Sequence, residues 1–155
     1  MKRRIQIAKY VAADYVSANL AWLLFNLFRF YVGGASREFL SLSAFLGDKV
    51  LLEGQLLFPL LWMFIYYLSG YYNQPFLKSR LLEFFTTLFS SLLGSVIVFF
   101  VALLNDIAYL DIGDYKLLLV LFFLQFVCTY LPRLMITQIA TDRIHTRMWG
   151  FDTLI

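Results

Sequence analysis

The chain has 155 residues, of which 61% are hydrophobic, 19% aromatic and only 15% charged, and its mean hydropathy is +0.74. This composition is far more apolar than that of a soluble domain. It therefore excludes a protein that is surrounded mainly by water. The formal net charge is +3, but the basic residues flank the apolar segments, so the charge indicates membrane topology and not nucleic-acid binding. The one cysteine, Cys128, lies in an apolar run, which excludes a disulfide or a cysteine metal site within one chain.

The apolar segments predict an all-α membrane protein, a bundle of four transmembrane helices. A hydrocarbon core about 30 Å thick requires about 20 apolar residues in a helix, and no alternating strand pattern is sustained along the chain. The expected spans are residues 10–32, 52–69, 84–104 and 115–135. Between the first two, Gly33 and Gly34 break the helix, and the mixed apolar and charged residues 36–53 predict a short interfacial amphipathic helix.

The distribution of basic residues predicts the orientation of the bundle. Nine lie on the side of the N-terminus: Lys2, Arg3, Arg4, Lys9, Lys78, Arg80, Arg133, Arg143 and Arg147. Four lie on the other side, Arg29, Arg37, Lys49 and Lys116, where the third loop also carries Asp106, Asp111 and Asp114. The positive-inside rule therefore places both termini and the loop 70–83 in the cytoplasm.

A cleaved signal peptide is the alternative for the first segment. Basic residues precede an apolar stretch, and the small residues Gly33 and Ala35 resemble a cleavage site. The apolar region is longer than the core of a signal peptide, however, and it contains Asp14 and Arg29. These features favour a retained helix.

Asp14 is the most informative polar residue of the predicted spans. An ionised side chain in the bilayer costs up to about 3 kcal/mol on insertion scales, so Asp14 is expected to face protein. Helical spacing puts it beside Ser17, Ala18 and Ala21, a face that allows close helix approach. We expect a basic partner from the cytoplasmic side, Arg133 or Arg80; the alternative is a proton or substrate site of a small transporter.

Further polar residues of the spans predict helix packing. Asn19, Asn26 and Arg29 share one stripe of the first span, so the two amides are expected to hydrogen-bond across helices while Arg29 extends outward. Ser90, Ser91, Gly94 and Ser95 form a small-residue stripe in the third span.

Catalytic motifs are absent from the sequence. His145 is the only histidine and has no cysteine or second histidine with which to bind a metal. No phosphate-binding loop, complete dinucleotide fingerprint or nucleophile elbow occurs. We therefore predict no catalytic, cofactor-binding or metal-binding residues and no cofactor in this chain.

A set of short motifs follows the second span: Gly70-Tyr71-Tyr72, Pro75-Phe76, Ser79-Arg80 and Glu83. Together with Asp14 and with Arg29-Phe30 at the end of the first span, they resemble the N-terminal membrane region of bacterial polyprenyl glycosylphosphotransferases. The final residues, 150–155, resemble the first strand of the cytoplasmic nucleotide-binding-like domain that follows the fourth helix in that family.

The resemblance implies that residues 1–149 are the membrane domain of an enzyme of the bacterial inner membrane. Such an enzyme moves a sugar-1-phosphate from a nucleotide sugar to undecaprenyl phosphate and so starts capsule, exopolysaccharide or O-antigen assembly. Its catalytic residues belong to a C-terminal domain outside this sequence, and residues 150–155 are the expected start of the nucleotide-binding-like domain. The implied partners are membrane lipids, including undecaprenyl phosphate, the cytoplasmic domains and further copies of the chain.

Other functions remain open at this point. Membrane-bound nucleotide-sugar dehydratases and epimerases carry a comparable four-helix N-terminus. A small transporter often shows a weaker charge bias than this sequence has. A stand-alone scaffold for polysaccharide assembly is the remaining alternative.

Overall fold

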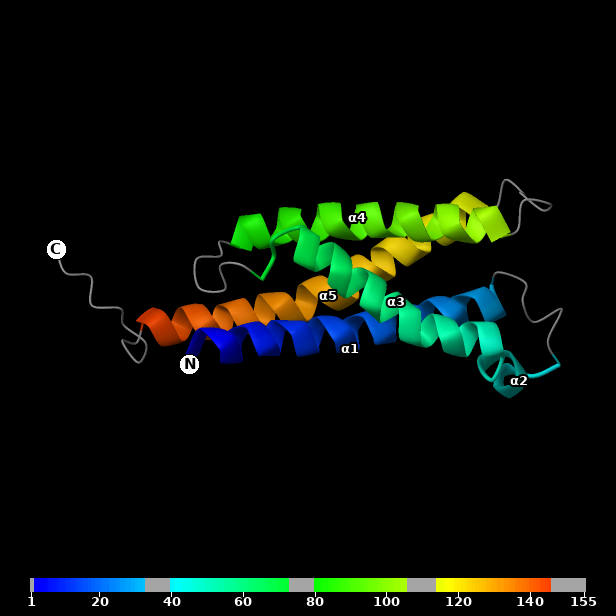
Figure 1. Cartoon of the computed structure of the whole chain (residues 1–155), viewed down its shortest axis with the longest axis horizontal. Helices are drawn as coiled ribbons and strands as arrows, with labels where there is room; N and C mark the ends of the chain where they lie inside the picture. Colours follow the sequence, from blue (N-terminus) through cyan, green and yellow to red (C-terminus); the bar gives the residue numbers. More distant parts are fainter. Residues whose placement is uncertain (1, 33–39, 73–79, 106–113, 146–155) are drawn as a thin grey trace.

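The computed structural model describes residues 2–32, 40–72, 80–105 and 114–145, and their regular secondary structure is α-helical (Figure 1). The helices are α1 (Lys2–Tyr31), α2 (Leu42–Leu46), α3 (Lys49–Leu68), α4 (Arg80–Asn105) and α5 (Asp114–His145). Within these segments four helices are long and apolar enough to cross a membrane, over Arg4–Tyr31, Lys49–Leu68, Arg80–Val101 and Tyr115–Ile139. The predicted all-α architecture with four helices able to span a membrane is confirmed.

All four long helices extend past the predicted spans, α1 and α5 by the most. α1 begins at Lys2 and not at position 10, and α5 continues to His145, beyond position 135. The predicted bounds followed the apolar residues, whereas the helix continues through lysine, arginine and glutamine, which are good helix formers. The limits of an apolar run are therefore not the limits of the helix.

The described residues hold one short helix between the first two spans, inside the range 36–53 of the prediction. The helix α2 has only five residues, and Ser41 caps it by accepting a hydrogen bond of 3.2 Å from the Ala44 amide. Asp48 then starts α3, since its Oδ2 accepts a bond of 3.1 Å from the Val50 amide. The end of the predicted range therefore belongs to α3, and positions 36–39 lie outside the described residues.

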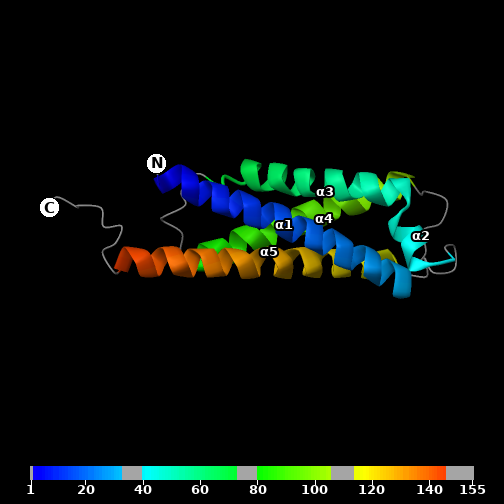
Figure 2. The same cartoon turned by 90° about the horizontal axis from the view of Figure 1, so that it is seen from below.

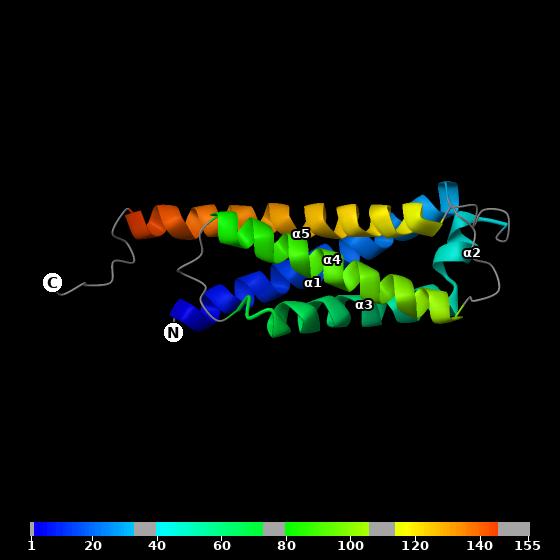
Figure 3. The ribbon, with the colours of Figure 1, turned by 90° about the horizontal axis from the view of Figure 1, so that it is seen from above.

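The four long helices form a bundle in which consecutive helices run in opposite directions (Figure 1). α1 lies between α3 and α5 (Figure 2), and α4 crosses between the same two helices on the other side (Figure 3). α2 packs on the far end of α1 and the start of α3, with Phe45 buried against Phe30 at 5.3 Å between ring centroids. The start of α1 and the end of α5 consequently lie at the same end of the molecule.

The distribution of polarity is the reverse of that in a soluble protein. Val16, Leu56 and Phe123 are each more than 60% exposed, and apolar side chains cover the outside of all four long helices. Asp14 and Arg133 are almost completely buried. A surface of this kind is stable in hydrocarbon, where polar groups must find partners inside the protein.

Two tryptophans packed on glycines bring the helices together. Trp22 of α1 lies over Gly54 of α3, and Trp62 of α3 lies over Gly94 of α4. A Cβ atom at Gly94 would come within 2.2 Å of Trp62 Cζ3. Gly94 therefore permits the α3–α4 contact by lacking a side chain, as is common where membrane helices meet.

The substitution Gly94→Ala tests this contact. Replacing glycine by alanine within a helix usually stabilises it by about 1 kcal/mol, but here the added methyl group must displace Trp62. We expect a net destabilisation of about 1–3 kcal/mol, measured by thermal unfolding in detergent. Leu93→Ala is the control because Leu93 is 55% exposed on the neighbouring face. A more stable Gly94→Ala variant would contradict the packing described.

Candidate functional site

Asp14 of α1 and Arg133 of α5 form an ion pair inside the bundle. Arg133 Nε donates to Asp14 Oδ1 at 2.7 Å, and Arg133 Nη2 donates to Asp14 Oδ2 at 2.8 Å. The side chain of Arg133 is 0% exposed and that of Asp14 is 1% exposed. This two-point geometry is the strongest arrangement that a guanidinium and a carboxylate can adopt. Arg80, the other candidate partner, is exposed at the start of α4.

The other two long helices also contribute to the pair. Arg133 Nη1 donates to Thr87 Oγ1 of α4 at 2.9 Å. The hydroxyl of Tyr72, just past α3, donates to Asp14 Oδ2 at 2.7 Å. Both oxygens of the carboxylate and all three nitrogens of the guanidinium therefore have hydrogen-bond partners. The pair joins α1, α4, α5 and the turn after α3.

Two tyrosine rings cover the guanidinium. The Arg133 Cζ atom lies 3.6 Å from the ring centroid of Tyr71 and 4.0 Å from that of Tyr66. Aromatic faces attract a cation, and the attraction is greatest where water is excluded. The planar edge of Arg133 therefore makes hydrogen bonds while its faces make cation–π contacts.

The positions of Tyr71 and Tyr72 are set by the way α3 ends. Gly70 adopts a φ of 68°, in the left-handed region that glycine favours. The Tyr71 amide donates to the Tyr66 carbonyl at 3.2 Å, and the Gly70 amide donates to the Tyr67 carbonyl at 3.0 Å. This is the glycine-terminated helix end known as a Schellman motif. It turns the chain so that both tyrosines reach the ion pair.

Glu83 places a second carboxylate beside the pair. It is 1% exposed, and its Oε1 accepts a hydrogen bond of 2.5 Å from the hydroxyl of Tyr71. Glu83 Oε2 is buried without a hydrogen-bond partner in the described part of the chain. Burial raises the pKa of Tyr71 and the pKa of Tyr72 above their ordinary values. Both phenols therefore stay protonated and donate to the two carboxylates.

A buried polar row on α5 extends the network on both sides of Arg133. Its other members are Gln125, Thr129 and Thr137. Gln125 Nε2 donates to Thr129 Oγ1 and to the Tyr66 hydroxyl, each at 3.1 Å. Beyond the pair, Thr137 shares a hydrogen bond of 2.8 Å with Tyr10 of α1. This row was not predicted from the sequence, although its spacing of four residues was a usable signal because it places all members on one helix face.

The remaining predicted residues lie apart from the ion pair. Asn19 Oδ1 accepts a bond of 2.7 Å from Gln55 Nε2 of α3 and so links two helices, as expected. Asn26 does not link two helices, since its Nδ2 donates to the Trp22 carbonyl of its own helix at 3.0 Å. Arg29 lies in the last turn of α1. The remaining motif residues, Pro75, Phe76 and Ser79, lie outside the described residues.

The pair can be tested by a double-mutant cycle. Removing one partner of a buried pair leaves an uncompensated charge and costs about 3–5 kcal/mol. We expect Asp14→Asn and Arg133→Gln each to reduce the amount of folded protein in the membrane. The double variant, which removes both charges of the pair, should be less impaired than the sum of the two. Normal membrane assembly of both single variants would show that the pair is not needed.

Comparison of the chain with protein-family models, curated proteins and solved structures found no match. Among the described residues, no three His, Cys, Asp or Glu side chains are grouped so as to hold a metal ion. The observed arrangement is an ion pair whose hydrogen-bonding groups are occupied by the protein, which favours holding the helices over transforming a substrate.

Proposed function

We propose that this chain is the membrane-anchoring domain of a bacterial sugar-phosphate transferase, which moves a sugar-1-phosphate from a nucleotide sugar to undecaprenyl phosphate. The observation that carries the proposal is the convergence of motif residues on the ion pair. Gly70 turns the chain, Tyr71 and Tyr72 contact Arg133 and Asp14, and Glu83 accepts from Tyr71. These residues carry the resemblance to the family. They are far apart in the sequence but contribute to one cluster.

The lengths of the helices support a role in positioning whatever follows α5. α3 has 20 residues, which at about 1.5 Å per residue is just sufficient to cross the hydrocarbon core. α1 and α5 have 30 and 32 residues and project together at the end where α1 starts. The Tyr10–Thr137 hydrogen bond holds them together beyond the ion pair. We infer a short two-helix stalk that carries the chain away from the membrane.

The distribution of charge supports an orientation with the stalk in the cytoplasm. Arg133 is buried and neutralised by Asp14, so it no longer counts as a flanking residue. Eight basic residues remain on the side of the stalk against four on the other side. On this assignment the membrane is the bacterial inner membrane, both termini are cytoplasmic, and α2 lies at the outer interface.

The occupied state of Asp14 argues against the transporter alternative. A proton or substrate site needs a carboxylate that exchanges partners, whereas both oxygens of Asp14 are bound by Arg133 and Tyr72.

Cysteine labelling tests the orientation. Lys9 and Lys49 are both exposed, Lys9 on the stalk and Lys49 at the opposite end of the bundle. With Cys128 replaced by alanine, we expect Lys49→Cys to react with a membrane-impermeant maleimide in intact spheroplasts. Lys9→Cys should react only after the membrane is permeabilised. Labelling of Lys9→Cys in intact spheroplasts would overturn the assignment.

The transferase proposal is tested with the native gene product in its source membrane. We expect a product much heavier than the 18.1 kDa of this chain. We also expect its membranes to transfer radiolabelled sugar-1-phosphate from a nucleotide sugar to added undecaprenyl phosphate, with release of the nucleoside monophosphate. Asp14→Asn should reduce transfer in proportion to the loss of membrane-inserted protein, because the pair acts on assembly. A product of about 18.1 kDa without transfer would overturn the proposal.

A further inference from the structure

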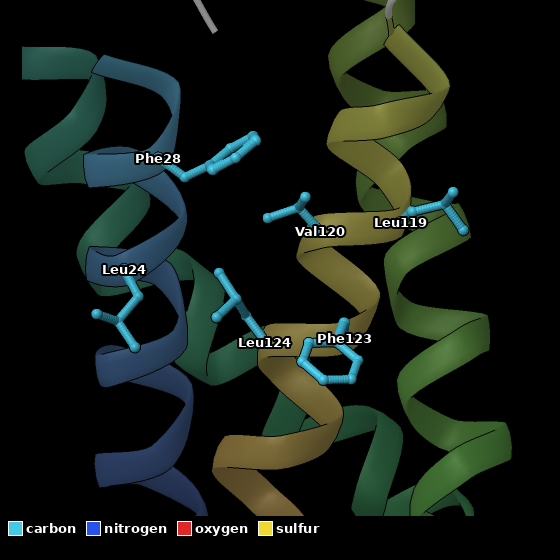
Figure 4. Close-up of a pocket in the computed structure, with 6 residues that line it drawn as sticks. All are labelled: Leu24, Phe28, Leu119, Val120, Phe123 and Leu124. Atoms are coloured by element: carbon cyan, nitrogen blue, oxygen red, sulfur yellow. The ribbon is translucent and has the colours of Figure 1, made fainter. Parts of the chain in front are cut away.

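A groove separates α1 from α5 at the end of the bundle away from the ion pair. Its volume is about 400 Å³, within the range of ligand pockets. Six apolar side chains line it: Leu24, Phe28, Leu119, Val120, Phe123 and Leu124. Phe28 of α1 and Val120 of α5 point toward each other across the gap (Figure 4). A ligand in this groove must therefore present an apolar segment.

The groove lies at the depth of the lipid chains and reaches the edge of the spans. Phe28 is three residues before Tyr31, where the first span ends, and Leu119 is four residues after Tyr115, where the fourth begins. At about 1.5 Å per residue, both are within about 6 Å of the membrane boundary. Leu24 and Leu124 extend the walls further into the hydrocarbon. A molecule in the groove can consequently keep a polar end at the interface.

A basic residue stands on the α5 wall where the groove meets the interface. Lys116 is three and four residues before Leu119 and Val120, so it continues the same face of α5 by one turn, and it is exposed. Long basic side chains near the ends of membrane helices extend toward the headgroups. Charge complementarity therefore favours an anionic headgroup above an apolar chain.

We propose that this groove binds one acyl chain of an anionic phospholipid, whose phosphate is held by Lys116. The site lies in the leaflet opposite the stalk and does not depend on the function of the chain. A neutral phospholipid would fill the groove equally well but would gain less from the charge of Lys116. Selectivity for the anionic headgroup is therefore the property that distinguishes the site from general contact with lipid.

Native mass spectrometry of the whole chain, released from vesicles of equal phosphatidylglycerol and phosphatidylcholine, tests the proposal. We expect phosphatidylglycerol to be retained preferentially. Lys116→Gln should lower the ratio of the two bound lipids about fivefold, the effect of one basic residue near an anionic surface. Val120→Trp, which fills the groove, should lose both lipids. Lys116 is exposed at a helix end, so its substitution leaves the fold intact.

Lys49→Gln is the matched control. Lys49 is an exposed lysine at the same end of the bundle, but it lies on α3 and pairs with Glu53 at 3.7 Å. We expect its variant to keep the lipid preference of the original chain. Equal retention of the two lipids by the original chain, or an equal loss in the Lys49 and Lys116 variants, would overturn the site. A dimer without bound lipid would show that a second copy fills the groove and would also overturn it.

Discussion

The buried pairing of Asp14 with Arg133 is the constraint on which the arrangement of the bundle depends. Each charge alone would cost about 2.5–3.5 kcal/mol at the centre of a membrane helix on insertion scales. Together they neutralise each other, and hydrogen bonds from Tyr72 and to Thr87 occupy the remaining polar atoms. Because these groups come from different parts of the chain, the helices can satisfy the pair in few arrangements. We infer that the pair contributes more to specificity than to net stability, since desolvation offsets much of the Coulomb attraction.

The turn after α3 places two tyrosine side chains against the ion pair. Gly70 ends the helix with a positive φ, and the following two tyrosines contact opposite members of the ion pair. Replacing Gly70 by a residue with a side chain would strain this turn and move both aromatic rings. The glycine and the two tyrosines thus act together, since the glycine ends the helix and the tyrosines contact the ion pair.

The two ends of the bundle differ in chemistry. At one end, the ion pair and the Tyr10–Thr137 hydrogen bond hold α1 and α5 together. At the other end, the same two helices separate around an apolar groove. In a membrane, lipid chains replace water as the solvent of such a groove, so the gap needs no polar lining. The end with the ion pair is therefore the end of the proposed stalk, and the end with the groove faces lipid.

The sequence by itself determined the class of the protein, four apolar helices in a membrane, because hydropathy and span length depend only on local composition. It also showed that Asp14 requires a buried partner, and it grouped Tyr71, Tyr72 and Glu83 by resemblance. Only the tertiary structure decided that the partner is Arg133 and not Arg80, across 119 residues of sequence. It alone also brought Thr87 and the polar row of α5 to the pair. The reason is that partner choice depends on which helix faces meet, and helix packing is fixed by the shapes of side chains such as Trp62 over Gly94.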